Sequence, residues 1–350
     1  MVGIWYTSRE QVKQAMDFKE TARSDGQVDG AIEAASRDVE ALCHRIFYPV
    51  QATRYFDWPG HQYARPWRLW LDQDELIAVD SITTGGVPLV DGDWLLEPAN
   101  DGPPYNRIEI NLAADAAFSS GDTFQQAIAV TGLFGFADTT TPAGVLAGAV
   151  AAGDGTVTVD GPASAELGVG SLLRLDDERM TVTGRRQVET GQTLAAAMAN
   201  QNNDVTVQLA NATGFAPGET VLVDGERMYI IDVAGDALVV KRAWDGSNLA
   251  AHTAGATVYA PRRLAVRRGV LGTTAATHNA AAPVLTWEPP GPVRELTEAL
   301  ALNTVLQQQS GYARQVGSGE GQREASGRGI ANLRDRVYHS HGRMARVRAV

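Results

Sequence analysis

The sequence contains a single cysteine, Cys43, so the chain cannot form an internal disulfide. It also lacks a long apolar run, since no stretch approaches the roughly 20 apolar residues that a membrane-spanning helix requires. Residues 1–14 lack the basic stretch and long apolar run of a secretory signal. We therefore expect a protein of cytoplasmic origin, with no membrane segment and with Cys43 as a buried, unreactive thiol.

The sequence is short of basic side chains, and those present are unevenly distributed. The formal net charge is −11, which argues against general binding of nucleic acid, because neutralised phosphates supply that affinity. Residues 315–350 reverse this balance, with seven arginines against three acidic residues. The sequence therefore describes an acidic body with a basic tail.

Sequence signatures of catalysis and of metal binding are missing. The chain has no GxxxxGKS/T phosphate loop, no GxSxG or HExxH motif and no Rossmann glycine signature. Cys43 and His44 are adjacent, and His339 and His341 are two residues apart, so neither pair brings two ligands together on a helix. We expect no enzymatic activity, no cofactor and no bound metal.

Two stretches of the sequence are each present twice. The stretch 156–182 (A) recurs at 204–230, and the stretch 238–258 (B) recurs at 264–284, which gives the order A, A, B, B. An internal duplication changes what counts as a domain. The matching residues that we expect to be structurally important are Glu178, Arg179 and Met180 with Glu226, Arg227 and Met228, and His252 with His278.

The order of the copies favours insertion of one β-module into another. A tandem pair would have the order A, B, A, B, whereas here one A-B unit, residues 203–261, separates the two parts of the other, 151–202 and 262–287. Insertions are tolerated at exposed loop tips, and the polar sequence "MANQNNDVT" before the inner unit suits such a junction. We expect two nested modules, and a tandem pair remains the alternative.

Within the modules, the repeated polar residues favour structural roles over ligand binding. Each repeated His follows a turn at the same place, which favours a histidine that closes a loop over a metal ligand. The pair Asp224-Gly225 predicts a tight hairpin turn, which we favour over a calcium site.

Three helices are predicted outside the repeats and the C-terminal segment. The stretch 7–18 opens with a capping box formed by Thr7 and Glu10. A third helix starts near Pro292, with its apolar face at Val293, Leu296, Leu300 and Leu306. The second helix has an apolar stripe with alternating spacings of four and three, formed by Val28, Ile32, Ala35, Val39 and Leu42. This stripe can serve the core or a seam between subunits, and we favour the core.

From Pro49 to about residue 136 the sequence has the short apolar runs and Gly, Pro, Asp and Asn breaks of antiparallel strands. This region contains four clustered tryptophans, Trp58, Trp67, Trp70 and Trp94. Such a cluster can form a platform on which sugars stack, although aromatic residues in alternating strands more often belong to a core.

The segment 315–350 starts with a Gly-rich joint and could form a short helix from Ile330 to Tyr338. It is either a disordered tail or a segment that orders against a partner. Its candidate docking residues are Arg323, Arg328, Arg334, Arg336, Tyr338, Arg343, Arg346 and Arg348.

The chain outside the repeats contains a series of motifs in a particular order: "YTSREQVKQAM", "AIEAASRDVEALCHRIFYP", "TRYFDWPG", "RLWLDQDELIAVDSITTGG", "AIAVTGLFGF" and "VRELTEALAL". Together with the Arg-rich terminus, this series resembles the head-to-tail connector (adaptor, or head-completion) proteins of long-tailed bacteriophages. The resemblance covers residues 1–150 and 288–350. The region 151–287 departs from it, and is similar to the "RGxxGTTAxxH" modules of phage structural proteins, except that Ala243 stands where the second copy has Gly269.

The resemblance implies a virion structural protein of the neck, between head and tail. Its members form a ring, typically of twelve subunits, below the portal protein, and a tail-side stopper or neck protein binds beneath it. DNA passes through the lumen without sequence-specific binding, which suits an acidic body. The basic tail would dock on the portal, and the β-modules would decorate the outside of the ring.

We therefore predict an α+β fold, with a helical and antiparallel-β connector body and an inserted all-β region of two related small barrels or sandwiches. The predicted parts are the body (1–150), the modules (151–287), a returning helix (288–314) and the portal-docking tail (315–350). The alternative function is that of a phage tail or baseplate binding module whose β repeats contact a host surface glycan.

Overall fold

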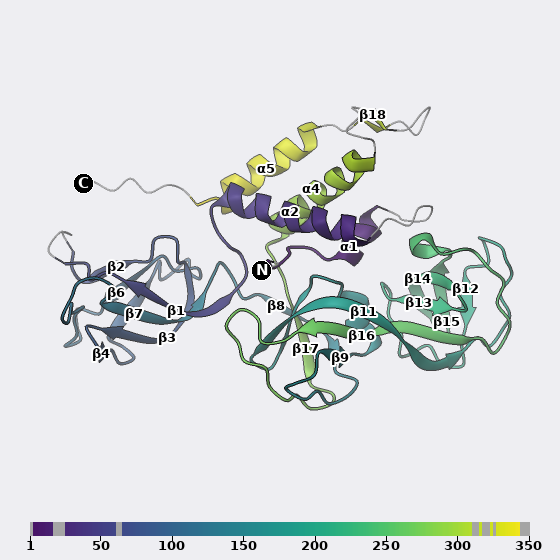
Figure 1. Cartoon of the computed structure of the whole chain (residues 1–350), viewed down its shortest axis with the longest axis horizontal. Helices are drawn as coiled ribbons and strands as arrows, with labels where there is room; N and C mark the ends of the chain where they lie inside the picture. Colours follow the sequence, from purple (N-terminus) through teal and green to yellow (C-terminus); the bar gives the residue numbers. More distant parts are fainter. Residues whose placement is uncertain are drawn as a thin grey trace. The chain divides into compact units, whose positions relative to one another are not determined.

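The computed structural model describes residues 3–16, 25–60, 65–309, 315–316, 323–324 and 327–343. The fold is α+β, with mostly antiparallel sheets and few helices (Figure 1). The chain divides into two compact units: unit 1 comprises Met1–Val39, Thr140–Val270 and Thr274–Ser340, and unit 2 comprises Glu40–Thr139, Leu271–Thr273 and His341–Val350. The predicted domain boundaries were based on the repeats and not on this division, so they stay a prediction.

The helices outside the β-modules bring residues from both ends of the chain into one hydrophobic cluster. This cluster includes Val12, Ile32 and Val305, one residue from each of three helices. None of the helices in the described residues is long and apolar enough to cross a membrane. The helices are α1 (Arg9–Ala15), α2 (Asp25–Cys43), α4 (Gly291–Gln309) and α5 (Gly327–His341), and a short helix, α3 (Gly161–Glu166), lies within the modules.

The apolar stripe predicted on α2 lies mostly in the interior. Leu42 is half-buried, whereas the other four residues of the stripe, Val28, Ile32, Ala35 and Val39, are buried. On α4 the predicted Val293 and Leu296 are buried, whereas the predicted Leu300 and Leu306 are only half-buried. Four buried positions on this helix follow a spacing of four. These positions on α4 are Val293, Thr297, Ala301 and Val305.

The start of α1 differs from the prediction by one residue. Ser8, and not Thr7, caps the helix: its Oγ accepts a hydrogen bond from the Gln11 N–H at 3.2 Å, and the Gln11 side chain accepts one from the Ser8 N–H at 3.0 Å. Glu10 instead accepts a hydrogen bond from the backbone N–H of Val169 at 2.6 Å. The predicted Thr7–Glu10 capping box was therefore wrong, because Glu10 binds a distant turn of the chain.

Unit 1 contains a ten-stranded sheet in the order β12-β15-β14-β13-β16-β11-β10-β17-β8, and β9 also pairs with β16. The long strands β11 and β16 run side by side, from the Thr181–Arg267 pair to the Thr193–Thr257 pair (Figure 1). The strands are β8 (Thr140–Val145), β9 (Thr156–Thr158), β10 (Leu172–Leu175), β11 (Glu178–Thr193), β12 (Thr206–Gln208), β13 (Thr220–Val223), β14 (Glu226–Ala234), β15 (Ala237–Lys241), β16 (Thr257–Arg267) and β17 (Pro283–Trp287).

The strands of unit 1 enclose two separate hydrophobic clusters. The first contains buried residues from 143–182 and 264–284, and the second contains buried residues from 194–258. The repeated methionines are divided between them, with Met180 in the first cluster and Met228 in the second. Strand β16 contributes to both, because Val258 belongs to the second cluster and Leu264 to the first.

The hairpin turns predicted in the repeats are present. Val223 pairs with Glu226 across the two-residue turn at Asp224, whose φ of 53° is in the left-handed region. Leu175 pairs with Glu178 across the equivalent turn. Asp and Asn adopt this conformation more readily than most residues, which explains the Asp at the start of both turns.

Unit 2 contains a four-stranded sheet, β1-β7-β3-β4, and a three-stranded sheet, β2-β6-β5. Residues Ile82, Ile108 and Val130 come from the two sheets and belong to one hydrophobic cluster. The strands are β1 (Val50–Phe56), β2 (Arg68–Trp70), β3 (Leu76–Thr84), β4 (Val87–Pro88), β5 (Trp94–Glu97), β6 (Arg107–Ile110) and β7 (Ile128–Phe134).

Candidate functional site

The repeated charged residues come together as one buried cluster in each module. In the inner cluster, Arg242 donates from Nε and Nη2 to the two carboxylate oxygens of Glu226, at 2.7 and 2.8 Å. Both side chains are fully buried. A planar guanidinium matches a carboxylate in this two-pronged geometry, which a Lys side chain cannot reproduce.

His252 completes the inner cluster. Its Nε2 lies 3.0 Å from Oε2 of Glu226, and its Nδ1 lies 2.7 Å from Oδ2 of Asp224. The backbone N–H groups of Ala243 and Ala250 donate to the same Glu226 carboxylate at 2.9 and 3.0 Å. The carboxylate and both nitrogens of the imidazole ring therefore have partners within the protein.

The rest of the Arg242 guanidinium holds two loops together. Its Nη1 donates to the carbonyl oxygens of Ala199 and Asp204, at 3.2 and 3.0 Å, and its Nη2 donates to the carbonyl of Ala250 at 2.5 Å. These carbonyls lie in the loops before β12 and after β15. One buried side chain thus satisfies backbone groups that would otherwise be costly to bury.

The outer cluster has the same geometry. Arg268 donates to the two carboxylate oxygens of Glu178 at 2.6 and 2.7 Å, and His278 lies 2.9 Å from Glu178 and 2.7 Å from Asp176. The Gly269 N–H donates to Glu178 at 3.0 Å, as the Ala243 N–H does to Glu226. Two copies of one motif therefore build two copies of one buried network.

The hydrogen bonds keep both glutamates ionised. Burial by itself raises the pKa of Glu226, but hydrogen bonds from Arg242, the Ala243 N–H and His252 outweigh it and lower the pKa to about 2. The same balance of burial against hydrogen bonds from Arg268 and its neighbours lowers the pKa of Glu178 to about 2. Each cluster is therefore a charged network at neutral pH, whose groups already bind one another.

The other predicted module positions have different roles. Arg179 is buried, whereas the equivalent Arg227 is partly exposed and pairs with Asp245 at 3.0 Å. Arg242 and Arg268 were not among the predicted positions, although their identity in both copies was a signal that could have identified them. No group of three or more His, Cys, Asp or Glu residues is arranged to hold a metal ion in the part of the chain that the structure describes.

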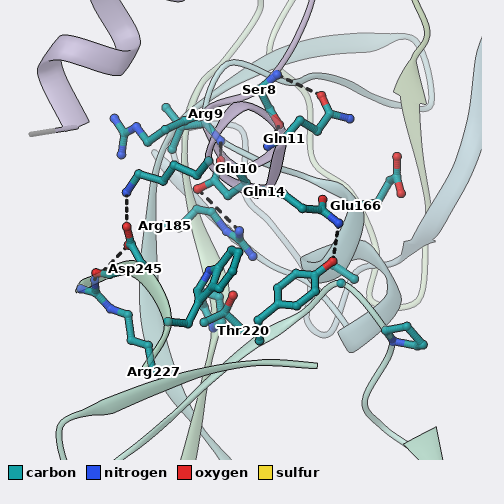
Figure 2. Close-up of a pocket in the computed structure, with 18 of the residues that line it drawn as sticks. Ser8, Arg9, Glu10, Gln11, Gln14, Glu166, Arg185, Thr220, Arg227 and Asp245 are labelled. Atoms are coloured by element: carbon teal, nitrogen blue, oxygen red, sulfur yellow. Dashed lines mark hydrogen bonds and ion pairs between the residues drawn. The ribbon is translucent and has the colours of Figure 1, made fainter. Parts of the chain in front are cut away.

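A polar cavity of about 620 Å³ lies in unit 1, where α1 faces both repeat copies (Figure 2). Lys13 reaches across it and binds Asp25 at 2.6 Å and Asp245 at 2.8 Å. Gln14 donates to the hydroxyl oxygen of Tyr229 at 2.5 Å. Helix α1 is thereby attached to the inner module by a cation and by a side-chain amide.

The cations of the polar cavity are engaged by nearby carboxylates. Burial alone would lower the pKa of Lys13, but its hydrogen bonds to Asp245 and Asp25 outweigh it and raise that pKa. Arg9 binds Asp29 through Nε at 2.7 Å, and Arg227 shares Asp245 with Lys13. A phosphate or carboxylate ligand would have to compete with these pairs, so the polar cavity is better suited to fastening α1 than to anion binding.

The two modules differ in what covers one pair of equivalent turns, residues 168–170 in the outer module and residues 216–218 in the inner module. In the outer module, residues 168–170 are buried, because Trp5 lies against Gly170 and the Arg9 N–H donates to the Val169 carbonyl at 3.0 Å. In the inner module the equivalent residues, 216–218, are half-buried or exposed, and Gly218 lines the polar cavity. The duplication therefore produced one surface that the N-terminal segment covers and one that stays open.

The candidate docking residues of the tail fall into three groups. On α5, Arg334 is exposed, Tyr338 is half-buried, and Arg336 pairs with Glu295. Arg343 pairs with Glu75 at 3.2 Å within unit 2. The side chains of Arg323, Arg328, Arg346 and Arg348 lie outside the described residues.

Helix α5 is longer than the helix predicted from Ile330 to Tyr338. Val337 on this helix is fully buried. The backbone N–H of Arg343, just after the helix, donates to the Cys43 carbonyl at 2.9 Å. The Cys43 side chain is itself buried, and burial raises the pKa of its thiol to about 11, which makes it a poor nucleophile at neutral pH.

Comparisons with models of protein families, with curated proteins and with solved structures found no match. The clusters and the polar cavity are therefore interpreted from their geometry. In all three places, charged side chains bind each other or the backbone and hold segments of the chain together.

Proposed function

We propose that the protein is a structural, non-enzymatic adaptor in the neck of a long-tailed phage, which forms a ring below the portal. The observation that carries this proposal is that both Glu–Arg–His clusters bind backbone carbonyls with the same cations that neutralise their carboxylates. This is the arrangement of groups that fix loops, whereas a catalytic base must reach a substrate proton. The proposal that the assembly is a phage neck rests on the order of the sequence motifs that resemble those of phage connectors.

We propose that the inner module, residues 203–261, is inserted into the outer one. The sequence ranges of the two hydrophobic clusters support this proposal, because 194–258 lies between 143–182 and 264–284. In the proposed ring, the nested pair of modules would lie on the outer surface, and the helices would form the contacts between subunits.

The mass of the assembly tests the proposed ring. The full chain would be purified alone and with its portal protein, and the mass would be measured by native mass spectrometry or mass photometry. A twelve-subunit ring that binds the portal supports the proposal. A monomer or trimer that does not bind the portal contradicts it, and would favour the alternative of a tail or baseplate binding module.

Portal docking by the basic tail is tested with a single substitution. Deletion of the whole tail would also remove the buried Val337 and the Arg343–Glu75 pair. We therefore choose Arg334→Glu, because Arg334 is exposed on α5. It should weaken portal binding and leave the chain folded, whereas Arg186→Glu, at an exposed arginine of β11, should not. Equal binding by both variants would exclude a role for Arg334 in docking.

A further inference from the structure

A second cavity, of about 430 Å³, lies within unit 2 beside the end of β1 and the strand β2. Its volume is in the range of small-molecule binding sites. We call it the aromatic pocket, because its lining includes Tyr55, Trp58 and Trp70, together with the polar residues Asp57, Asp72 and Gln126.

Phe56 also lines the pocket and packs against the core of unit 2, and the other three aromatic residues are held in different ways. Trp58 packs against the core of unit 2, and its Nε1–H donates to the carbonyl of Phe118 at 2.9 Å. Trp70 is half-buried and, unlike Trp58, lies outside that core cluster. Tyr55 is 62% exposed. The pocket therefore combines a fixed indole, a half-buried indole that has Arg68 and Arg107 beside it, and an exposed phenol ring.

The polar groups of the pocket offer hydrogen-bond acceptors. Asp57 and Asp72 are both exposed carboxylates. The Gln126 N–H donates to Asp57 at 2.8 Å, which fixes that carboxylate beside the pocket. Arg68, the one cation among the described residues of the lining, binds Glu109 at 2.6 Å. A carboxylate oxygen can accept more than one hydrogen bond, so Asp57 can still accept from the hydroxyl groups of a ligand. The side-chain amide of Gln126 can also bind a hydroxyl group.

This chemistry excludes several kinds of ligand. An anion would meet the carboxylates of Asp57 and Asp72. A cation would meet two guanidinium groups at Trp70, since Arg107 and Arg68 lie 5.0 and 5.7 Å from its ring centroid. A fully apolar ligand would remove water from the carboxylates without replacing its hydrogen bonds.

A sugar ring has the complementary chemistry. One face carries C–H groups that pack on aromatic rings, and the edge carries hydroxyls that donate to carboxylates. We propose that the aromatic pocket of unit 2 binds a neutral carbohydrate, with Tyr55 and Trp70 against the ring and Asp57 and Asp72 accepting from its hydroxyls. This inference is independent of the proposed adaptor function, because it concerns one pocket within a single chain.

A titration with free sugars tests the proposal. The full-length protein would be titrated separately with glucose, galactose, mannose, N-acetylglucosamine, maltose and lactose, and followed by calorimetry and by tryptophan fluorescence. We expect saturable binding of at least one sugar, with a change in fluorescence because Trp58 and Trp70 line the pocket. The proposal is overturned if none of the six sugars shows saturable binding. It is also overturned if inorganic phosphate or trimethylammonium binds in this pocket.

Matched variants locate the binding site. Tyr55→Ala and Asp72→Asn should each weaken binding of that sugar by about tenfold, on the order of one lost stacking or hydrogen-bonding contact. Asn suits position 72 because the backbone φ there is 52°, which Asn tolerates. Phe124→Ala is the control, since Phe124 is a 58% exposed aromatic of unit 2 outside the pocket lining.

The outcomes separate binding from folding. All three variants should keep the wild-type circular dichroism spectrum, because the substituted side chains are exposed. Unchanged affinity in both pocket variants would overturn the proposal. An equal loss of affinity in Phe124→Ala would do so too, because that result would place the sugar elsewhere on unit 2.

Discussion

Arg242 and Glu226 form a two-pronged ion pair that is fully buried in the inner module. A buried pair costs much of its attraction in lost hydration, so its main effect is to fix geometry. Here the fixed elements are the loop before β12 and the loop after β15, which Arg242 joins through three carbonyl groups. Arg268 and Glu178 do the same in the outer module.

Glu226→Gln should destabilise the inner module strongly. The substitution leaves the buried Arg242 charge uncompensated, which costs roughly 3–5 kcal/mol in comparable cases. The measurement is the free energy of unfolding by urea, together with hydrogen exchange of the amides in β12 and β15. Arg227→Gln is the matched control, because its pair with Asp245 is partly exposed and should contribute about 1 kcal/mol or less. Equal effects of the two substitutions would contradict the structural role of the cluster.

Stability should fall in acid because of the two buried glutamates. The folded-state pKa of Glu178 and Glu226 is lowered from 4.5 to about 2, so each carboxylate stabilises the fold above pH 4.5. That contribution is lost as the pH falls from 4.5 toward 2, by about 3 kcal/mol for each group. Unfolding free energies measured between pH 6 and pH 2 should therefore drop steeply in the wild type. The Glu178→Gln, Glu226→Gln double variant should show a shallower slope, and parallel curves would refute the assignment.

Gly170→Ala should cost more than Gly218→Ala. The two glycines have equivalent backbone conformations, with φ of 96° and 95°, so both variants carry the same strain of about 1–3 kcal/mol. Only at Gly170 would the added methyl group strike Trp5, because the nearest atom at Gly218 is 3.6 Å away. Denaturation and the fluorescence of Trp5 should show a displaced N-terminal segment in Gly170→Ala alone. If the N-terminal segment is not displaced in Gly170→Ala, then the contact with Gly170 does not hold Trp5 in place.

Removal of the inner module should leave the outer module folded. Val188 and Ala260 are paired across β11 and β16, so excision of residues 188–260 removes the inner module with the adjoining ends of these strands and joins two backbone ends that lie close together. The outer hydrophobic cluster contains no residue from this range. The shortened chain should unfold cooperatively and retain the acid sensitivity due to Glu178. Aggregation or loss of the cooperative transition would favour a tandem pair that folds as one body.

Local features of the fold were predictable from the sequence because their causes are local. The Asp-Gly turn after β13 depends on two adjacent residues, and the stripe on α2 depends on helical spacing. The capping box was wrong by one residue because Glu10 binds Val169, far along the chain. A motif of four residues cannot reveal that competing partner.

The sites depend on distant contacts, and they were less predictable. Glu178 and Arg268 are 90 residues apart, so their identity in both copies marked them without showing that they meet. The sequence left the tryptophan cluster open between a sugar-stacking platform and a core, and only the structure shows which tryptophans pack against the core. Trp58 packs against the core and Trp70 does not, a difference that alternation along a strand does not decide.

The continuity of β11 and β16 also determines how the modules would respond to force. These strands cross from one hydrophobic cluster to the other without an intervening linker. A force applied to the inner module would thus act on the backbone hydrogen bonds between β11 and β16. In a protein whose modules are joined by a flexible linker, the same force would bend the linker. Although the pairing of β11 and β16 has register shifts at three places, this joint of two paired strands resists bending more than a single-stranded linker would, which would suit the proposed ring adaptor.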